Sequence, residues 1–109
     1  MNIEEIKSLE IKKYQNFDLD RLVIYAMVFL YEKNIQLSLE NIIVGSFKLF
    51  PEKFSLSGFP KYPDATRVEK ALWRCKGKKR QWIGGKTPFG YSLNRRSYII
   101  ASEVQKELL

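Results

Sequence analysis

The apolar and polar positions along the chain predict four main helices, the first two within residues 18–49. From Asp18 to Asn34, apolar residues recur at helical spacing and nearly surround the helix, with Asp18 as the N-cap. A helix that is apolar on almost every side is expected to be buried at the centre of the fold. A second helix is predicted over residues 39–49, beginning after the N-cap Ser38 and stopped by Pro51.

The other two helices follow from similar start and stop signals. The third is predicted over residues 65–76, between Asp64 as the N-cap and Gly77 as the C-terminal stop. Asn94 is expected to cap a last helix, which carries one apolar stripe toward the end of the chain.

Between these helices the pattern predicts short extended segments. Two strands, residues 81–83 and 89–93, are expected to form a hairpin whose tip is residues 84–88, because the glycines of the tip permit positive φ. Residues 35–37 alternate and form either a short strand or an extended link. Residues 54–63 are predicted to be a turn-rich connection whose aromatic side chains hold it against the body.

The predicted elements form one domain with two flanking segments. Residues 1–17 are either an arm or a short helix, residues 18–94 carry the predicted core and hairpin, and residues 95–109 are the C-terminal helix. The fold class is therefore expected to be α+β and mostly helical. No glycine stop or basic last turn closes the final helix, so we expect either that its end frays or, as the favoured alternative, that it continues in a longer chain.

Composition excludes several classes of protein. The 109 residues contain no histidine and one cysteine, so a zinc site, an internal disulfide and a Cys–His pair are all ruled out. The longest apolar run, residues 22–31, has ten residues, which is too short to cross a bilayer, and no signal-peptide pattern opens the chain. We therefore expect a soluble cytoplasmic protein with no membrane partner.

Net charge points to a polyanionic partner. The whole chain carries +7, but residues 64–96 hold ten basic residues against two acidic ones, an excess of +8, whereas residues 1–63 sum to zero. Five of these cations fall within residues 74–80. Such a concentration is typical of nucleic-acid binding, although a basic solvated face is the simpler alternative.

The third predicted helix carries part of this charge on one side. At 100° per residue, Ala65, Val68, Ala71, Leu72 and Cys75 share an apolar arc, and the opposite arc is polar. A basic helix of this kind fits the major groove of DNA, where arginine bonds guanine edges. The residues predicted to read DNA from this helix are Thr66, Arg67, Lys70 and Arg74.

The order of helix, helix, basic helix, hairpin and closing helix resembles the winged helix-turn-helix family. Residues 90–101 are similar to the aromatic-x-Leu-Thr-x-x-Gly-x-x-x-Ala stretch that follows the wing in many bacterial and archaeal regulators, with Asn94 in place of Thr and Ser97 in place of Gly. The resemblance implies a three-helix core, a two-stranded β-wing and a C-terminal helix. Its wing tip would contact DNA through Lys86 and Thr87, and the subfamily is not assigned.

The remaining basic residues are predicted to hold DNA phosphates. They are Lys76, Lys78, Lys79, Arg80, Arg95 and Arg96. No pair of carboxylates lies in an apolar setting, so we expect no catalytic residues, no cofactor and no enzyme activity. Cys75 is interpreted as a buried structural thiol, Trp82 as a core residue, and Trp73 as packed rather than in contact with a base or sugar.

Two functions of different class follow. The first is double-stranded DNA binding, as a transcriptional regulator or as the targeting module of a larger system. The alternative is a winged-helix module that binds RNA or an acidic protein without sequence-specific DNA binding. For a homodimer, the available segments are the N-terminal residues and the C-terminal helix.

Overall fold

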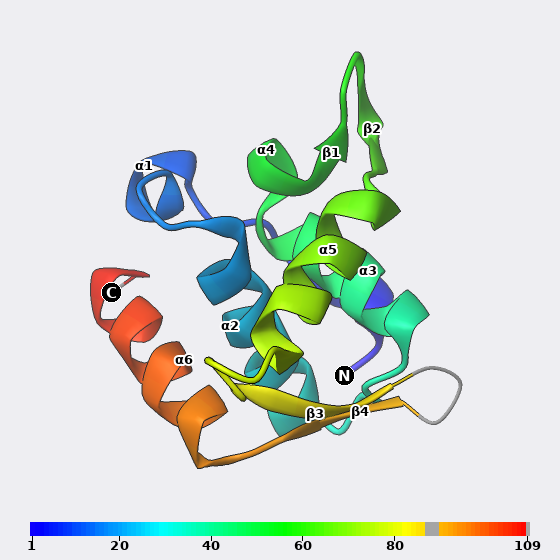
Figure 1. The fold of residues 1–109 in the computed structure, drawn as a ribbon. Coiled ribbons are helices and arrows are strands. Elements are labelled where there is room, and N and C mark those ends of the chain that lie inside the picture. The colour runs from blue at the N-terminus through cyan, green and yellow to red at the C-terminus, as the bar shows by residue number, and fades with distance from the viewer. Residues whose placement is uncertain (87–89, 109) are drawn as a thin grey trace.

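The structure, a computed structural model, describes residues 1–86 and 90–108. Within these residues it contains six α-helices and two antiparallel hairpins, which confirms a mostly helical α+β fold (Figure 1). The elements in chain order are η1 (Ile3–Glu5, a 3-10 helix), α1 (Ile11–Tyr14), α2 (Leu19–Glu32), α3 (Leu39–Leu49), α4 (Pro51–Phe54), β1 (Ser55–Leu56), β2 (Phe59–Pro63), α5 (Ala65–Lys76), β3 (Ile83–Lys86), β4 (Gly90–Leu93) and α6 (Arg95–Leu108).

Side-chain caps explain where the long helices begin. In each case the cap oxygen accepts a hydrogen bond from a backbone N–H of the first turn, which has no partner within the helix. The four predicted caps are confirmed: Asp18, Ser38, Asp64 and Asn94. Pro51 does end α3, but it also opens the short helix α4, because a proline is well suited to the first helical position.

The helix α2 is the centre of the core, as its all-round apolar pattern predicts. Leu22, Ile24, Met27 and Leu30 are fully buried, and α2 packs against α3, α5 and α6. Figure 1 shows α2 enclosed by these helices. Burying such side chains stabilises the fold by about 1.5–3 kcal/mol each, so α2 is the main source of hydrophobic stabilisation.

Both flanking segments contribute to the same core. In the N-terminal segment, Ile6 and Tyr14 are buried, and the Tyr14 hydroxyl donates to the Glu52 carboxylate. In α6, Ile100, Ala101, Val104 and Leu108 are buried, which confirms the predicted stripe. Ile6, Tyr14 and the α6 residues Ile100, Val104 and Leu108 belong to a single cluster with α2.

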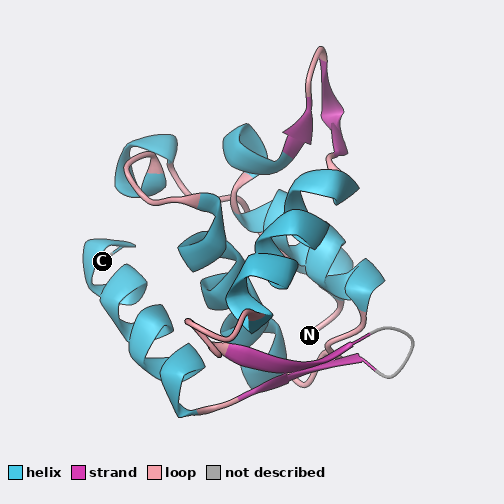
Figure 2. Cartoon of the chain, viewed as in Figure 1, coloured by secondary structure: helices cyan, strands magenta, loops and turns pink. Residues whose placement is uncertain are grey.

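The connection between α3 and α5 differs from its prediction. It contains α4 and the hairpin β1–β2, which stands away from the helices (Figure 2). Phe54 is buried, but Phe59 and Tyr62 are 59% and 61% exposed, so the prediction that the aromatic residues hold this segment against the body is wrong for both. Gly58, with φ of 81°, permits the turn of the hairpin.

The hairpin β3–β4 begins later than predicted. Gln81 has a positive φ of 47°, which no strand tolerates, so β3 starts at Ile83 rather than at residue 81. The ladder pairs Ile83 with Leu93 and Gly85 with Tyr91, and much of the predicted tip is therefore strand. Residues 87–89 lie outside the described residues.

Residues 35–37 are an extended link, one of the two forms expected. The Leu37 carbonyl accepts a hydrogen bond of 2.9 Å from the Tyr91 N–H, which ties the link to β4. In the described part of the chain, no helix combines the length and the apolar character needed to cross a membrane.

Candidate nucleic-acid interface

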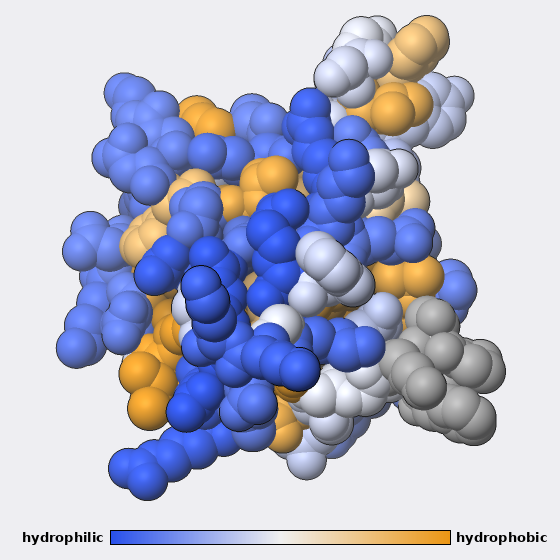
Figure 3. Space-filling view, viewed as in Figure 1, coloured by the Kyte–Doolittle hydropathy of each residue, from blue (hydrophilic) through white to orange (hydrophobic). Residues whose placement is uncertain are grey.

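The helix α5 has one buried and one exposed side. Val68, Ala71, Leu72 and Cys75 are buried, as predicted, and the outer side faces solvent. On this outer side, Thr66, Lys70, Trp73 and Arg74 are exposed, and Arg67 is partly buried. Seen from the side of α5, the surface is dominated by hydrophilic side chains (Figure 3). We call this surface, with residues 77–80 and the start of α6, the basic face.

Asp20 ties α5 to the central helix. This aspartate is 4% exposed and accepts hydrogen bonds from Arg74 Nε at 3.0 Å and from Arg74 Nη2 at 2.6 Å. The Arg80 guanidinium bonds the other oxygen of the same carboxylate. The hydrogen bonds from Arg74 to Asp20 raise the pKa of the Arg74 guanidinium. A buried carboxylate with two guanidinium partners fixes where the basic face sits relative to α2.

Arg67 links α5 to the hairpin β1–β2. Its guanidinium donates to the Lys53 carbonyl oxygen at 3.0 Å and to the Ser57 hydroxyl at 3.2 Å, and it forms an ion pair with Asp64 at 3.2 Å. Arg67 and Arg74 are both predicted to read DNA. Several N–H groups of each guanidinium are therefore already bonded to acceptors within the protein.

Arg80 and Trp82 organise the turn after α5. The Arg80 guanidinium carbon lies 4.4 Å from the centre of the Trp82 ring, and the Arg21 guanidinium carbon lies 5.4 Å from it. Arg96 donates to the Arg80 carbonyl oxygen at 2.8 Å. Trp82 is half-buried and packs against the core, in line with its interpretation as a core residue.

Most cations of the basic face that lack an acid partner among the described residues are lysines. In residues 1–86 and 90–108, no ion pair involves Lys70, Lys78, Lys79 or Arg95, and all four are exposed. Lys76 is partly buried, with its Nζ 5.9 Å from the centre of the Tyr91 ring. Among the predicted site residues, the four exposed cations Lys70, Lys78, Lys79 and Arg95 are the ones whose charge is most available to a ligand.

Trp73 does not pack, contrary to its prediction. Its side chain is 78% exposed, although it is the largest apolar group on α5. On the helical wheel it lies among polar residues, and no element within residues 1–86 and 90–108 covers its side chain. Of the two predicted wing contacts, Lys86 is the last residue of β3, and Thr87 lies outside the described residues.

Two departures from the winged-helix motif have local explanations. The Asn94 side chain accepts from the Arg96 N–H at 2.9 Å, so it caps α6 as threonine would. Ser97 is buried, accepts from the Asn94 N–H at 3.0 Å and donates to the Trp82 carbonyl. Glycine at this position would lack both hydrogen bonds, and the one to the Trp82 carbonyl joins α6 to the residue before β3.

Cys75 is buried, as predicted, and is not placed for thiolate chemistry. Burial is the main cause that raises the pKa of its thiol, to about 12. A thiol that stays protonated at neutral pH is a poor nucleophile and a poor redox sensor.

Sequence reasoning missed the role of Asp20 and the hairpin β1–β2. Asp20 lies in the first turn of α2, and its partners Arg74 and Arg80 lie 54 and 60 residues further along the chain, so no local pattern predicts these contacts. For the hairpin, Ser57–Gly58 is a turn dipeptide between Leu56 and Phe59, and this signal could have identified it.

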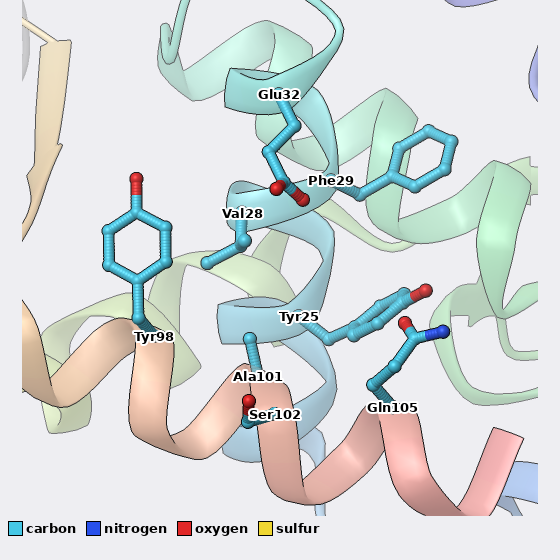
Figure 4. Close-up of a pocket in the computed structure, with 8 residues that line it drawn as sticks. All are labelled: Tyr25, Val28, Phe29, Glu32, Tyr98, Ala101, Ser102 and Gln105. Carbon is cyan, nitrogen blue, oxygen red and sulfur yellow. The ribbon is translucent and has the colours of Figure 1, made fainter.

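A groove on another side of the molecule lies between α2 and α6. Its volume is about 430 Å³, and Tyr25, Val28 and Phe29 face Tyr98 and Gln105 across it (Figure 4). Beside it, Tyr98 and Ile99 are 42% and 50% exposed. These apolar residues and Arg95 of the basic face line one surface hollow on the outer side of α6.

Among the described residues, no group of three or more histidine, cysteine, aspartate or glutamate side chains is placed to hold a metal ion. Comparison of the chain with protein-family models, curated proteins and solved structures finds no match.

Proposed function

We propose that this chain binds double-stranded DNA through the basic face, in the manner of a winged helix-turn-helix domain. The observation that carries the proposal is the exposed outer side of α5 together with four exposed cations that form no ion pair with the described residues: Lys70, Lys78, Lys79 and Arg95. Phosphate contacts from such cations supply most of the affinity of non-specific DNA binding.

The element order supports the winged-helix arrangement. α2, α3 and α5 would be its three core helices, β3–β4 its wing and α6 its closing helix. Helix α4 and the hairpin β1–β2 are an insertion between the second and third helices, where that family has a short turn. In this arrangement α5 enters the major groove, since the groove admits one helix.

The hydrogen bonds and ion pairs within the protein divide the predicted DNA-binding residues into two groups. In this proposal Arg67, Arg74 and Arg80 hold the basic face in place, and Lys70, Lys76, Lys78, Lys79 and Arg95 bind phosphates. Thr66 lies on the outer side of α5 and is available for a base or phosphate contact. For a homodimer, the outer side of α6 around Tyr98 and Ile99 is the better candidate, because Ile6 and Tyr14 of the N-terminal segment are buried in their own core.

A direct titration tests this proposal against a protein partner. A fluorescently labelled duplex of about 20 base pairs, two helical turns, is titrated with the whole chain at about 50 mM salt. A polyglutamate of equal charge is the matched polyanion. We expect the duplex to bind at least about tenfold more tightly, since α5 matches a groove and a flexible acidic peptide has none. Equal or tighter binding of the polyglutamate would favour an acidic protein partner instead.

A further inference from the structure

Trp73 is the most exposed large apolar side chain in the described part of the chain, and it stands within the basic face. An indole normally buries much of its surface, so one that is 78% exposed is available to a ligand. Its exposure exceeds that of Tyr62 at 61% and of Phe59 at 59%.

Surface hollows lie on two sides of Trp73, and cations line both. One, of about 540 Å³, is lined by Trp73 together with Lys76, Lys78, Lys79 and the two arginines that Asp20 holds. The other, of about 310 Å³, lies between Trp73, Lys70, Thr66 and Glu69. Lys70 is one helical turn before Trp73, so their Cβ atoms are about 5–6 Å apart.

We propose that Trp73 stacks on an unpaired base of DNA while Lys70 on one side and Lys78 and Lys79 on the other bind the flanking phosphates. The proposal rests on the proposed function, since it assumes that the basic face binds DNA. Aromatic side chains beside cations are the usual platform for single-stranded nucleic acid, because every base has a π-face.

The need for an unpaired base follows from the geometry of stacking. Inside a duplex both faces of each base are covered by its neighbours, and a groove presents only base edges. Away from the duplex ends, the ring of Trp73 therefore gains a stacking partner only where a base has left the stack, as in a single-stranded tail. The preferred substrate is thus a duplex with a single-stranded extension.

A free nucleotide offers the same chemistry as an unpaired nucleotide of DNA. The structure favours the polymer, because Lys70 and the pair Lys78 and Lys79 line separate hollows on either side of Trp73. A mononucleotide has one phosphate group and engages one of these cationic sites.

The experiment measures the affinity of the whole chain for four probes. They are a blunt duplex, the same duplex with a single-stranded tail of about six thymidines, the thymidine tail as a free single strand, and thymidine monophosphate. The variants are Trp73→Ala and Trp73→Phe. Tyr31→Ala is the matched control, because Tyr31 is 57% exposed on α2 and does not line either hollow.

We expect Trp73→Ala to weaken binding of the tailed duplex about tenfold more than it weakens binding of the blunt duplex. Trp73→Phe, which keeps an aromatic ring, recovers most of the loss, and Tyr31→Ala changes neither. The tail also quenches tryptophan fluorescence in the wild type but not in Trp73→Phe, where only the half-buried Trp82 remains.

Other outcomes overturn the proposal in distinguishable ways. An equal loss on tailed and blunt duplexes would assign Trp73 to duplex contact, and no loss on either would remove it from the interface, while the proposed function would stand. Binding of the monophosphate as tight as that of the tailed duplex would identify a nucleotide pocket. If the wild type bound no DNA, the proposed function itself would fail.

Discussion

Replacing Lys70, Lys78 and Lys79 together with glutamine is expected to weaken duplex binding about a hundredfold at about 0.15 M salt. Each phosphate contact contributes about 0.9 to the slope of log K against log salt, and three such contacts amount to about two orders of magnitude at this concentration. The three lysines are exposed and have no ion pair in residues 1–86 and 90–108, so their loss removes charge without removing an internal bond. Fluorescence anisotropy of a labelled duplex measures the effect.

The matched control for this variant is the replacement of Lys7, Lys12 and Lys13 with glutamine. These lysines are also exposed, and they lie in the N-terminal segment outside the basic face (Figure 1). Both triple variants change the net charge by the same amount, and both should leave the free energy of unfolding within about 0.5 kcal/mol of the wild type. Equal weakening by the two variants would mean that net charge, and not the basic face, binds DNA.

Replacing Asp20 with alanine is expected to have the largest effect on stability among the residues of the interface, about 2 kcal/mol. The carboxylate is buried and accepts charge-assisted hydrogen bonds from Arg74 and Arg80, each of which contributes more than a neutral bond. The loss stays moderate because the Arg74 and Arg80 side chains are 44% and 36% exposed and regain water. Thermal unfolding should show a decrease in Tm of about 10 °C.

Asp18→Asn controls for the charge change in the same helix. Asn retains the N-cap function, and Asp18 is exposed, so the expected loss is below about 1 kcal/mol even though the surface ion pair with Arg21 is removed. A Tm of Asp20→Ala equal to that of the wild type would show that the Asp20 contacts do not hold the basic face in place.

The long helices could be predicted because their signals are local. Asp64 and Gly77 bound α5 as expected, and the buried residues of α5 follow the helical spacing. The same holds for the cap Asn94 and the apolar stripe of α6. Caps, stops and periodicity act within a few residues, so a single sequence contains them.

The errors arose where tertiary contacts or exposure decide. Trp73 was expected to pack, because an exposed indole is uncommon and no sequence pattern reveals that its side of α5 stays uncovered. Arg67 and Arg74 lie on the predicted polar side of α5, but their acceptors belong to distant segments. The charge pattern therefore locates the cluster of cations along the chain, but it does not show which of them are paired inside the protein.

The most direct test of the central claim is the salt dependence of duplex binding by the unmodified chain. Lys70, Lys76, Lys78, Lys79 and Arg95 amount to about five phosphate contacts, so the slope of log K against log salt should be roughly −4 to −5 between about 50 mM and 200 mM salt. A slope near zero, or no binding to the duplex at the lowest salt, would contradict the proposal that the basic face binds DNA.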